Sequence, residues 1–403
     1  MHILFLTDNF PPEGNAPATR TYEHAVEWVK QGHQVTVITC APNFPEGKVF
    51  KGYKNSLYSR SKMDGIDVVR VKTFISSNEG FVLRILDFLS FMVSSFFAGL
   101  FQRNIDVVVA TSPQFFTAVS GWALSAVKRR KFVFELRDIW PASITAVGAM
   151  KDSVAIKLLE KLELFLYKRA DKIISVTNSF KRELIGRGID GDKIAVVVNG
   201  VDLTKYQPAE QKDQGFAEQY KLTDKFIIGY IGTHGMAHAL EHVINAAEKL
   251  KARDDIVFLF AGGGAARAGL QQLAIDKKLK NVVFIPRQPK ENMPKIWSLC
   301  DVSLVSLRDA ALFKTVIPSK IFESMGMGLP ILAAIPPGEA SGIIENAGAG
   351  VIVAPENSQL LAEQVVLLAE SEALRKNLSE NSAKGGFKFN RQLLAKKMLD
   401  ALA

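Results

Sequence analysis

Short apolar stretches rich in Val and Ile alternate along this chain with longer amphipathic stretches. An uninterrupted apolar stretch of about six residues is typical of a strand buried on both faces, and the amphipathic stretches are long enough for helices. The predicted strands of the first half are 2–7, 34–39, 66–71, 105–110, 131–136 and 172–176. Those of the second half are 226–231, 256–261, 281–285, 301–306, 330–334 and 350–353. This alternation predicts an α/β protein with two doubly wound, Rossmann-like sheets.

A polar stretch without hydrophobic periodicity, 199–216, separates the two series of strands. It reads NGVDLTKYQPAEQKDQGF and is typical of a connection between domains. We place the boundary near Asn199, which gives an N-terminal domain 1–199 and a C-terminal domain 200–403. A chain of 403 residues fits two domains of ordinary size. The segment 389–402 has helical periodicity and is compatible with packing on either domain.

One Phe-rich segment, 81–101, departs from the alternation. Its uncharged run 88–101 is shorter than the roughly 20 residues that a membrane-spanning helix needs, so we expect no transmembrane helix here. Two interpretations remain open. The segment is either a core helix, or an interfacial helix that inserts Phe91, Phe96 and Phe97 into an anionic membrane surface.

The net charge of +9 is concentrated in the first half. Residues 1–200 carry 26 Lys and Arg against 19 Asp and Glu, whereas residues 201–403 carry 24 against 22. A basic half is compatible with an anionic membrane, a phosphorylated substrate or nucleic acid, and composition does not choose among them. A hydrophobic content of 48% excludes a disordered chain.

The two cysteines, Cys40 and Cys300, are too few and too widely spaced for a zinc knuckle or a disulfide framework. The chain runs from Met1 directly into an apolar strand without a basic region or a cleavage site, so we expect no secretory signal. Both features favour a reducing cytoplasm.

The loop after the first predicted strand, TDNFPPEGNAPATR, is long and rich in Pro and Gly. In a parallel sheet it lies at the carboxyl edge, where ligands bind. Gly14 permits close approach of the backbone, and a helix is expected to begin near Ala18. No strand is followed by GxGxxG and no GxxxxGK[ST] occurs, which argues against nicotinamide and ATP chemistry.

Two segments of the second half have features of anion and nucleotide sites. Gly232, Thr233 and Gly235 follow the first strand of that half and precede a helix. In PSKIFESMGMGLPIL, Ser319 and Lys320 occupy the first turn of a predicted helix and Glu323 lies one turn further on, where a carboxylate can accept the two hydroxyls of a ribose. His234, His238 and His242 lack complementary carboxylates, so no metal site is expected.

Taken together, these segments resemble a known family, the retaining glycosyltransferases of the GT-B fold and family 4. The resemblance covers nearly the whole chain and is closest to bacterial enzymes of O-antigen and capsule synthesis. It rests on PPEGNAPATR, ELRDIWP, VVNGVD, YIGTHGMAHALEHVINAAEKL, PSKIFESMGMGLPIL and GEASGIIENAGAGVIV. It implies a GT-B fold, an acceptor-binding first domain and a nucleotide-sugar-binding second domain.

The resemblance also implies roles for single residues. Glu323 matches the second Glu of the E-x7-E motif, which holds the donor ribose, and Pro286 and Arg287 match positions that contact the base. Gly232 and Thr233 match the loop at the donor diphosphate. Gly14, followed by Asn15, matches the mobile loop that reaches toward donor and acceptor.

Two positions depart from the family pattern. Thr315 stands where the first Glu of E-x7-E is expected, and Arg137 stands where many members have the His of an HD pair, before Asp138. Both missing groups normally touch the transferred sugar, so the departures indicate a donor with another hydroxyl pattern, such as a 6-deoxy or amino sugar. This agrees with the resemblance, which is strongest to family members that transfer N-acetyl-L-fucosamine or related amino sugars and so implies an N-acetylated 6-deoxy amino sugar. The basic pair at the diphosphate is also incomplete, which leaves Lys320, Arg287 or Arg267 to supply the charge.

We therefore expect a retaining, metal-independent hexosyltransferase without a cofactor. Its expected partners are a UDP-sugar, a saccharide acceptor linked to a lipid of the undecaprenyl diphosphate type, and the inner face of the cytoplasmic membrane; nucleic acid is not among them. Arg137 and Asp138 are the catalytic candidates beside Glu323, with Asp138 or Glu135 orienting the acceptor. The alternatives are a nucleotide-sugar 2-epimerase of the same architecture and a non-catalytic scaffold at the membrane surface.

Overall fold

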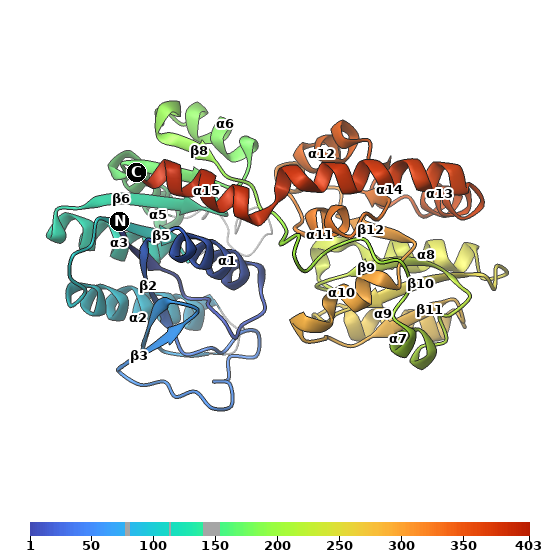
Figure 1. Cartoon of the computed structure of the whole chain (residues 1–403), viewed down its shortest axis with the longest axis horizontal. Helices are drawn as coiled ribbons and strands as arrows, with labels where there is room; N and C mark the ends of the chain where they lie inside the picture. Colours follow the sequence, from blue (N-terminus) through green and yellow to red (C-terminus); the bar gives the residue numbers. More distant parts are fainter. Residues whose placement is uncertain (77–80, 113, 140–153) are drawn as a thin grey trace. The chain divides into compact units, whose positions relative to one another are not determined.

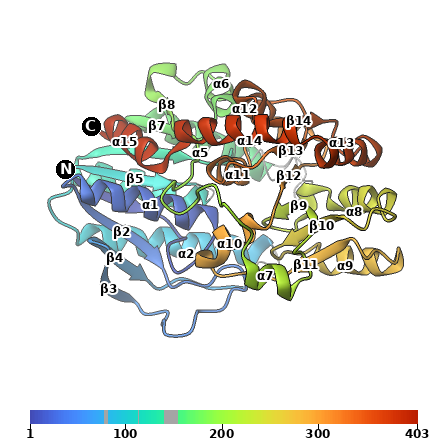
Figure 2. The same cartoon turned by 45° about the vertical axis from the view of Figure 1, so that its right-hand side comes forward.

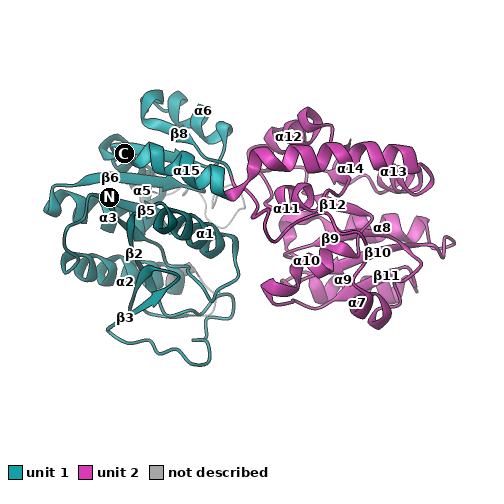
Figure 3. Ribbon diagram, in the orientation of Figure 1, with its two compact units in different colours: residues 1–198, 392–403 teal, residues 199–391 magenta. Residues whose placement is uncertain are grey.

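A computed structural model describes residues 1–76, 81–112, 114–139 and 154–403. The chain folds into two compact units, 1–198 with 392–403 and 199–391 (Figure 3). The first unit therefore ends next to the expected boundary at Asn199, and it also contains the last twelve residues, which the domain limits 200–403 assign to the second half.

The first unit is built on an eight-stranded sheet in the order β3-β4-β2-β1-β5-β6-β7-β8, in which only the β3–β4 pairing is antiparallel (Figure 1). Its strands are β1 His2–Leu6, β2 Gln34–Cys40, β3 Tyr58–Met63, β4 Ile66–Val71, β5 Val107–Thr111, β6 Lys131–Leu136, β7 Lys172–Ser175 and β8 Ile194–Val196. Its helices are α1 Ala16–Lys30, α2 Phe81–Leu100, α3 Phe115–Lys128, α5 Val154–Arg169, α6 Asn178–Gly186 and α15 Arg391–Leu402, with the 3-10 turn η1 Gly191–Lys193.

Helices cover both faces of this sheet. Residues of α2, α3, α5 and α6 share one hydrophobic cluster with strand residues. Residues of α1 and α15 share the other, in which the Trp28 indole donates a 2.9 Å hydrogen bond to the Ala395 carbonyl. The end of the chain therefore packs beside α1, as Figures 1 and 2 both show.

The second unit has a six-stranded parallel sheet in the order β11-β10-β9-β12-β13-β14. Its strands are β9 Phe226–Ile231, β10 Ile256–Ala261, β11 Val282–Ile285, β12 Val302–Ser306, β13 Ile331–Ala334 and β14 Gly350–Val353. Its helices are α7 Gln214–Gln219, α8 Leu240–Lys249, α9 Arg267–Asp276, α10 Met293–Ser298, α11 Lys320–Gly326, α12 Glu339–Ala347, α13 Ser358–Glu370 and α14 Glu372–Gly386. The 3-10 turns are η2 Met236–His238, η3 Lys290–Asn292, η4 Ala311–Lys314 and η5 Phe387–Phe389.

Every strand predicted from an apolar stretch is present, which confirms the two Rossmann-like sheets. The two strands that the pattern missed have a simple reason. β3 is a polar edge strand with almost entirely exposed side chains, and β8 has only three residues. Neither contains an apolar stretch of strand length.

α2 presents two different faces. Phe91 is fully buried in the core of the first unit, so its assignment to a lipid-facing group is wrong. Phe96 packs partly buried against the same core, whereas 57% of Phe97 is exposed. Of the described helices, this one alone is long and apolar enough to cross a membrane, by length and composition. In its window Leu83–Leu100 only 22% is buried, so most of the helix lies at the surface of the unit.

Candidate active site

Two glycine loops interlock at the carboxyl edge of the second sheet. After β9, the Gly232 amide donates to the Ala261 carbonyl (2.9 Å) and the His234 amide to the Gly263 carbonyl (2.8 Å). A side chain at Gly262 would collide with the Gly232 carbonyl, and Gly262 has a φ of 138°, which favours glycine. The glycines therefore allow two loops to meet backbone to backbone.

Lys320, at the start of α11, places its amine beside the first of these loops. A Cβ added to Gly232 would lie 3.3 Å from Lys320 Nζ. Only 8% of Lys320 is exposed, and no described residue accepts a hydrogen bond from its Nζ. The amine lies 3.3 Å from the centre of the Tyr230 ring. Burying an amine without a hydrogen-bond acceptor costs free energy. This arrangement is therefore typical of a residue that binds an anionic ligand.

Two histidines also pack against the Tyr230 ring. His234 is fully buried between Tyr230, Phe260 and Phe284, and neither of its ring nitrogens has a hydrogen-bond partner in the described part of the chain. His238 Nδ1 lies 3.2 Å from the Ser306 carbonyl. Burial, and then nearby positive charge that includes Lys320, lower the pKa of both imidazoles to about 4. Both rings are therefore neutral at physiological pH.

Glu323 lies one turn after Lys320 and is half-buried. The indole Nε1 of the buried Trp297 donates to its Oε2 (3.3 Å). A carboxylate held at one oxygen by a core tryptophan has a restricted orientation, as a site that receives a ribose requires.

The other sequence-predicted residues of this unit differ in how they are held. The Thr315 hydroxyl donates to the Leu312 carbonyl (2.8 Å). Arg267 Nη1 donates to the Gly262 and Ile285 carbonyls (2.7 and 3.0 Å), so its guanidinium braces the glycine loops. Pro286 and Arg287 are exposed after β11. Thr233 is exposed, while Gly235 and Ser319 are partly buried.

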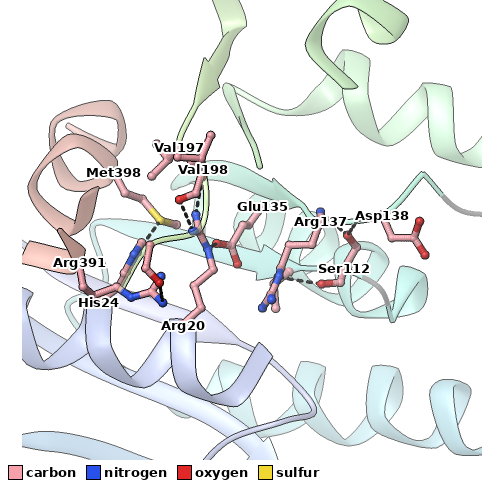
Figure 4. A network of polar contacts seen from close by, with 12 residues as sticks. Arg20, His24, Ser112, Glu135, Arg137, Asp138, Val197, Val198, Arg391 and Met398 are labelled. Atoms are coloured by element: carbon pink, nitrogen blue, oxygen red, sulfur yellow. Dashed lines mark hydrogen bonds and ion pairs between the residues drawn. The ribbon is translucent and has the colours of Figure 1, made fainter. Parts of the chain in front are cut away.

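In the first unit, a buried ion pair holds the residues that follow β8 (Figure 4). Arg20 Nε and Glu135 Oε1 are 2.8 Å apart, with 1% and 2% of the side chains exposed. The same guanidinium donates to the Val197 and Val198 carbonyls (2.9 and 2.8 Å), directly before the boundary of the unit. Burial raises the pKa of the Glu135 carboxyl, but the charges of Arg20 and Arg137 outweigh it and hold that pKa below its ordinary value. The Glu135 carboxylate is therefore ionised, and its role in the first unit is to pair with Arg20.

Arg137 and Asp138 follow β6 at the carboxyl edge of the first sheet. The Ser112 hydroxyl accepts hydrogen bonds from the backbone amides of Arg137 (2.8 Å) and Asp138 (3.2 Å) (Figure 4). This contact joins the end of β5 to the end of β6 and orders the backbone from which both side chains start. Both residues are partly buried.

The loop after β1 ends in a helix cap. Asn15 Oδ1 accepts from the Ala18 amide (2.9 Å), so Asn15 is the N-cap of α1, which begins at Ala16 rather than near Ala18. Its side-chain amide donates to the Asn9 side chain. Gly14 is exposed beside it.

Sequence reasoning missed a group of acids at this edge. Glu13 is 3% exposed, and its Oε1 accepts from the amides of Asn43 (2.7 Å) and Phe44 (2.9 Å). Burial raises its pKa to about 7, and the charge of Asp8 adds to this. Burial and the same Asp8 raise the pKa of Asp87, on α2, to about 7. The PPEG loop is visible in the sequence, but only folding brings an acid of α2 close to it.

This group predicts an unusual pH dependence. A carboxyl whose pKa is raised on folding keeps its proton longer in the folded state, so stability is highest below the ordinary value of about 4.5 and falls as the pH rises toward 7. Glu13→Gln keeps the acceptor for Asn43 and Phe44 but does not titrate. We expect the variant to be more stable than the parent above pH 7, by up to about 3 kcal/mol.

Hydrogen exchange of β1 and β2 amides between about pH 5.5 and 8, corrected for intrinsic rates, measures this difference within the first unit. Glu23→Gln, at a partly buried position of α1 outside the acid group, is the control. Equal pH profiles for the parent and Glu13→Gln would show that Glu13 titrates normally.

Among the described residues, no group of three or more His, Cys, Asp or Glu side chains is arranged to hold a metal ion. Each unit has candidate site residues at the carboxyl edge of its own sheet. One carries Gly232, Lys320 and Glu323, and the other carries Arg137, Asp138 and the acid group around Glu13. Tyr230, His234 and Trp297 were not recognised from the sequence as neighbours of the lysine and the glutamate, because they come from other elements.

Two family models match the chain. Residues 17–205 match the model of Glycosyltransferase Family 4, and residues 211–385 match that of Glycosyl transferases group 1. The chain is 27% identical to a putative colanic acid biosynthesis glycosyl transferase, WcaI of Escherichia coli K12, over 95% of this chain and 96% of that protein. It is 26% identical to a probable glycosyltransferase, WbjE of Pseudomonas aeruginosa, over 60% of each chain.

Solved structures agree on the fold. A sucrose-phosphate synthase of Thermosynechococcus elongatus superposes with a TM-score of 0.78 at 16% identity, covering 99% of this chain and 97% of that one. Anabaena HepE in complex with UDP and glucose gives a TM-score of 0.74 at 17% identity, covering 99% and 98%. With both sheets, both family models and these folds in agreement, the chain is a glycosyltransferase of the GT-B fold, with a family 4 region in its first half and a group 1 region in its second.

Proposed function

We propose that this enzyme transfers a sugar from a UDP-sugar to a lipid-linked saccharide during synthesis of a bacterial surface polysaccharide. The observation that carries the proposal is the buried amine of Lys320 beside Gly232, from which no described residue accepts a hydrogen bond. It lies one helical turn from the oriented carboxylate of Glu323. This pair offers a cation for a diphosphate and an acceptor for ribose hydroxyls. The name of WcaI, a putative colanic acid biosynthesis glycosyl transferase, supports a polysaccharide as the product. The UDP bound to HepE supports uracil as the base of the donor.

Among the three cations considered for the diphosphate, Lys320 fits best. Arg267 already donates to two backbone carbonyls. Arg287 is exposed after β11, next to Pro286, where it would contact the base. Gly232, Thr233 and Gly235 would supply close backbone approach to the phosphates.

Thr315 and Arg137 set the proposed sugar specificity. Because the Thr315 hydroxyl gives its proton to the Leu312 carbonyl, only its lone pairs remain for a ligand, and it accepts where a glutamate would carry charge. A neutral acceptor suits an N-acetylated 6-deoxy amino sugar, such as N-acetyl-L-fucosamine. Transfer would retain the anomeric configuration, with cationic side chains rather than a metal ion stabilising the leaving UDP.

The first unit would receive the acceptor. Arg137 and Asp138, ordered by Ser112, would face the reacting sugar and the attacking hydroxyl, and Gly14 and Asn15 would belong to the loop near both substrates. Asp138 rather than Glu135 would orient the acceptor, because 2% of the Glu135 side chain is exposed and its Oε1 pairs with Arg20.

Titration calorimetry with UDP, GDP and dTDP tests the donor site directly. We expect UDP to bind most tightly, whereas a non-catalytic scaffold would bind none of the three. Incubation with a labelled UDP-sugar, with and without a lipid-linked acceptor, then separates transfer from 2-epimerisation, because only transfer needs the acceptor.

We also propose that the first unit docks on the anionic inner face of the cytoplasmic membrane through α2. Its exposed apolar side chains recur at helical spacing along one face, at Leu83, Leu86, Val93, Phe97 and Leu100. Phe91 packs the opposite face into the core, which suits a helix lying in the interface. The excess of basic residues in 1–200 supplies the attraction, and docking there would bring a lipid-linked acceptor within reach.

Vesicle sedimentation measures this docking. We expect binding to vesicles with anionic lipid, weakened by salt, and a loss of most binding in a Val93→Ser/Phe97→Ser variant, because both side chains are about half exposed and their removal should not disturb the core. Ile275→Ser, at a similarly exposed position of α9 in the second unit, is the control. Unchanged binding of the double variant would place the membrane contact elsewhere.

A further inference from the structure

Three basic groups of the second unit pack around the ring of Tyr230. Lys320 approaches it from α11, His234 from the loop after β9, and His238 from η2. Tyr230 on β9 contacts all three, with ring centroids 5.9 Å from His234 and 5.8 Å from His238, and Lys320 Nζ 3.3 Å from its centre. Its hydroxyl donates to the Thr233 carbonyl (2.8 Å), which ties the ring to the glycine loop.

The charged groups near Lys320 do not offset the effect of burial on its pKa. Glu323, on the same helix, is the one acid that acts on Lys320, and it raises the lysine pKa less than burial lowers it. Arg267 adds positive potential at His234. No described oxygen accepts a hydrogen bond from Nζ, although the chain provides such acceptors for many other lysines.

The Tyr230 ring partly opposes this effect. The face of an aromatic ring attracts an ammonium group, by about 2 kcal/mol when water is excluded. Burial without a hydrogen-bond acceptor is the larger effect, because it removes the water that stabilises an ammonium group. The pKa of Lys320 is accordingly well below its ordinary value, with burial as the main cause.

We propose that Lys320 is largely neutral in the empty site and takes up one proton when the donor diphosphate binds, so that donor binding is linked to pH. This inference rests on the proposed donor site. The proton comes from solvent and stays on Nζ, where it forms the ammonium that pairs with a phosphate oxygen. The neutral histidines allow this, because two imidazolium groups around the same ring would repel the new charge.

The linkage has a definite sign. Between the pKa of Lys320 in the empty site and its higher value in the complex, the empty enzyme lacks a proton that the complex holds. Raising the pH in this interval therefore weakens donor binding, by up to about tenfold per pH unit for one proton. Near pH 8 the two histidines are neutral before the donor binds, because this pH is far above their pKa of about 4. The phosphates of UDP are fully ionised at this pH because their last pKa is about 6. Lys320 is then the group whose protonation changes.

Calorimetry of the full-length protein with UDP near pH 8 counts this proton. The binding enthalpy measured in Tris and in HEPES differs by the number of protons exchanged multiplied by the difference in the buffers' ionisation enthalpies. We expect uptake of about 0.5 to 1 proton per UDP by the parent protein. Lys320→Arg, which carries a permanent charge, should bind UDP with almost no proton uptake. Lys249→Met, at an exposed position of α8, should behave as the parent does.

The outcomes separate the two proposals. UDP binding without proton uptake in the parent overturns the linkage and leaves the donor site in place. Proton uptake that persists in both Lys320→Arg and Lys320→Met also overturns it, since another group would then be responsible. If UDP, GDP and dTDP all fail to bind, both the linkage and the proposed function are wrong.

Discussion

Glu323→Ala should lose nearly all transfer activity while the protein remains folded. The carboxylate is half-buried, held by the Trp297 indole, and lies one turn from Lys320 on α11. A lost charged hydrogen bond to a ribose costs about 1.5 to 3 kcal/mol, which corresponds to roughly tenfold to more than hundredfold in UDP affinity. Calorimetry with UDP gives the affinity, and transfer of a labelled sugar gives the activity.

Arg137→Ala is the matched contrast. Because Arg137 lies on the first unit and the proposed nucleotide site on the second, this variant should lose transfer while keeping the parent's UDP affinity. Trp297→Phe, which removes the hydrogen bond to Glu323 and part of a buried ring but keeps the carboxylate, should have a smaller effect on UDP affinity than Glu323→Ala. A Glu323→Ala protein that is soluble and binds UDP as the parent does would show that the ribose lies elsewhere. Loss of UDP affinity in Arg137→Ala would instead place that guanidinium on the nucleotide.

Glu135→Ala should destabilise the first unit by about 3 to 5 kcal/mol, the usual cost of leaving one member of a buried ion pair behind. Arg20 would keep its charge in a site where 1% of its side chain is exposed, beside the Val197 and Val198 carbonyls and without the carboxylate. Hydrogen exchange of β5 and β6 amides near pH 7 measures the loss within the first unit, without assuming two-state unfolding of a two-domain chain.

The exposed pair Lys30–Glu27 is the control, and Lys30→Ala should cost less than about 1 kcal/mol. The pH dependence has the opposite sign to that of Glu13. Because the pKa of Glu135 is lowered on folding, its contribution is complete above the ordinary value of about 4.5 and is lost as the pH falls below it. If Glu135→Ala costs no more than Lys30→Ala, the pair is not an important source of stability.

Much of the fold could be predicted because buried parallel strands produce an unmistakable pattern. Each predicted strand, from His2–Leu6 to Gly350–Val353, contains an apolar stretch, and apart from the edge strands β11 and β14 these strands are buried over nearly their whole length. The polar edge strand Tyr58–Met63 was not predicted because it has no apolar stretch. Backbone pairing with β4, and not burial of side chains, stabilises it. Glu323 and Lys320 could be named because a single helical turn contains both.

The surroundings of those residues belong to the tertiary structure alone. The helical period of α2 predicts which side chains share a face, but only packing decides that Phe91 points into the core and Phe97 away from it. Likewise, the basic pair Lys320 and Arg267 looks equivalent in sequence, yet Arg267 binds two carbonyls while Lys320 has no described acceptor. The sequence by itself determined which residue types follow which strands; burial and hydrogen bonding depend on contacts between elements distant in the chain, so only the folded structure decided which of these groups remain available to a ligand.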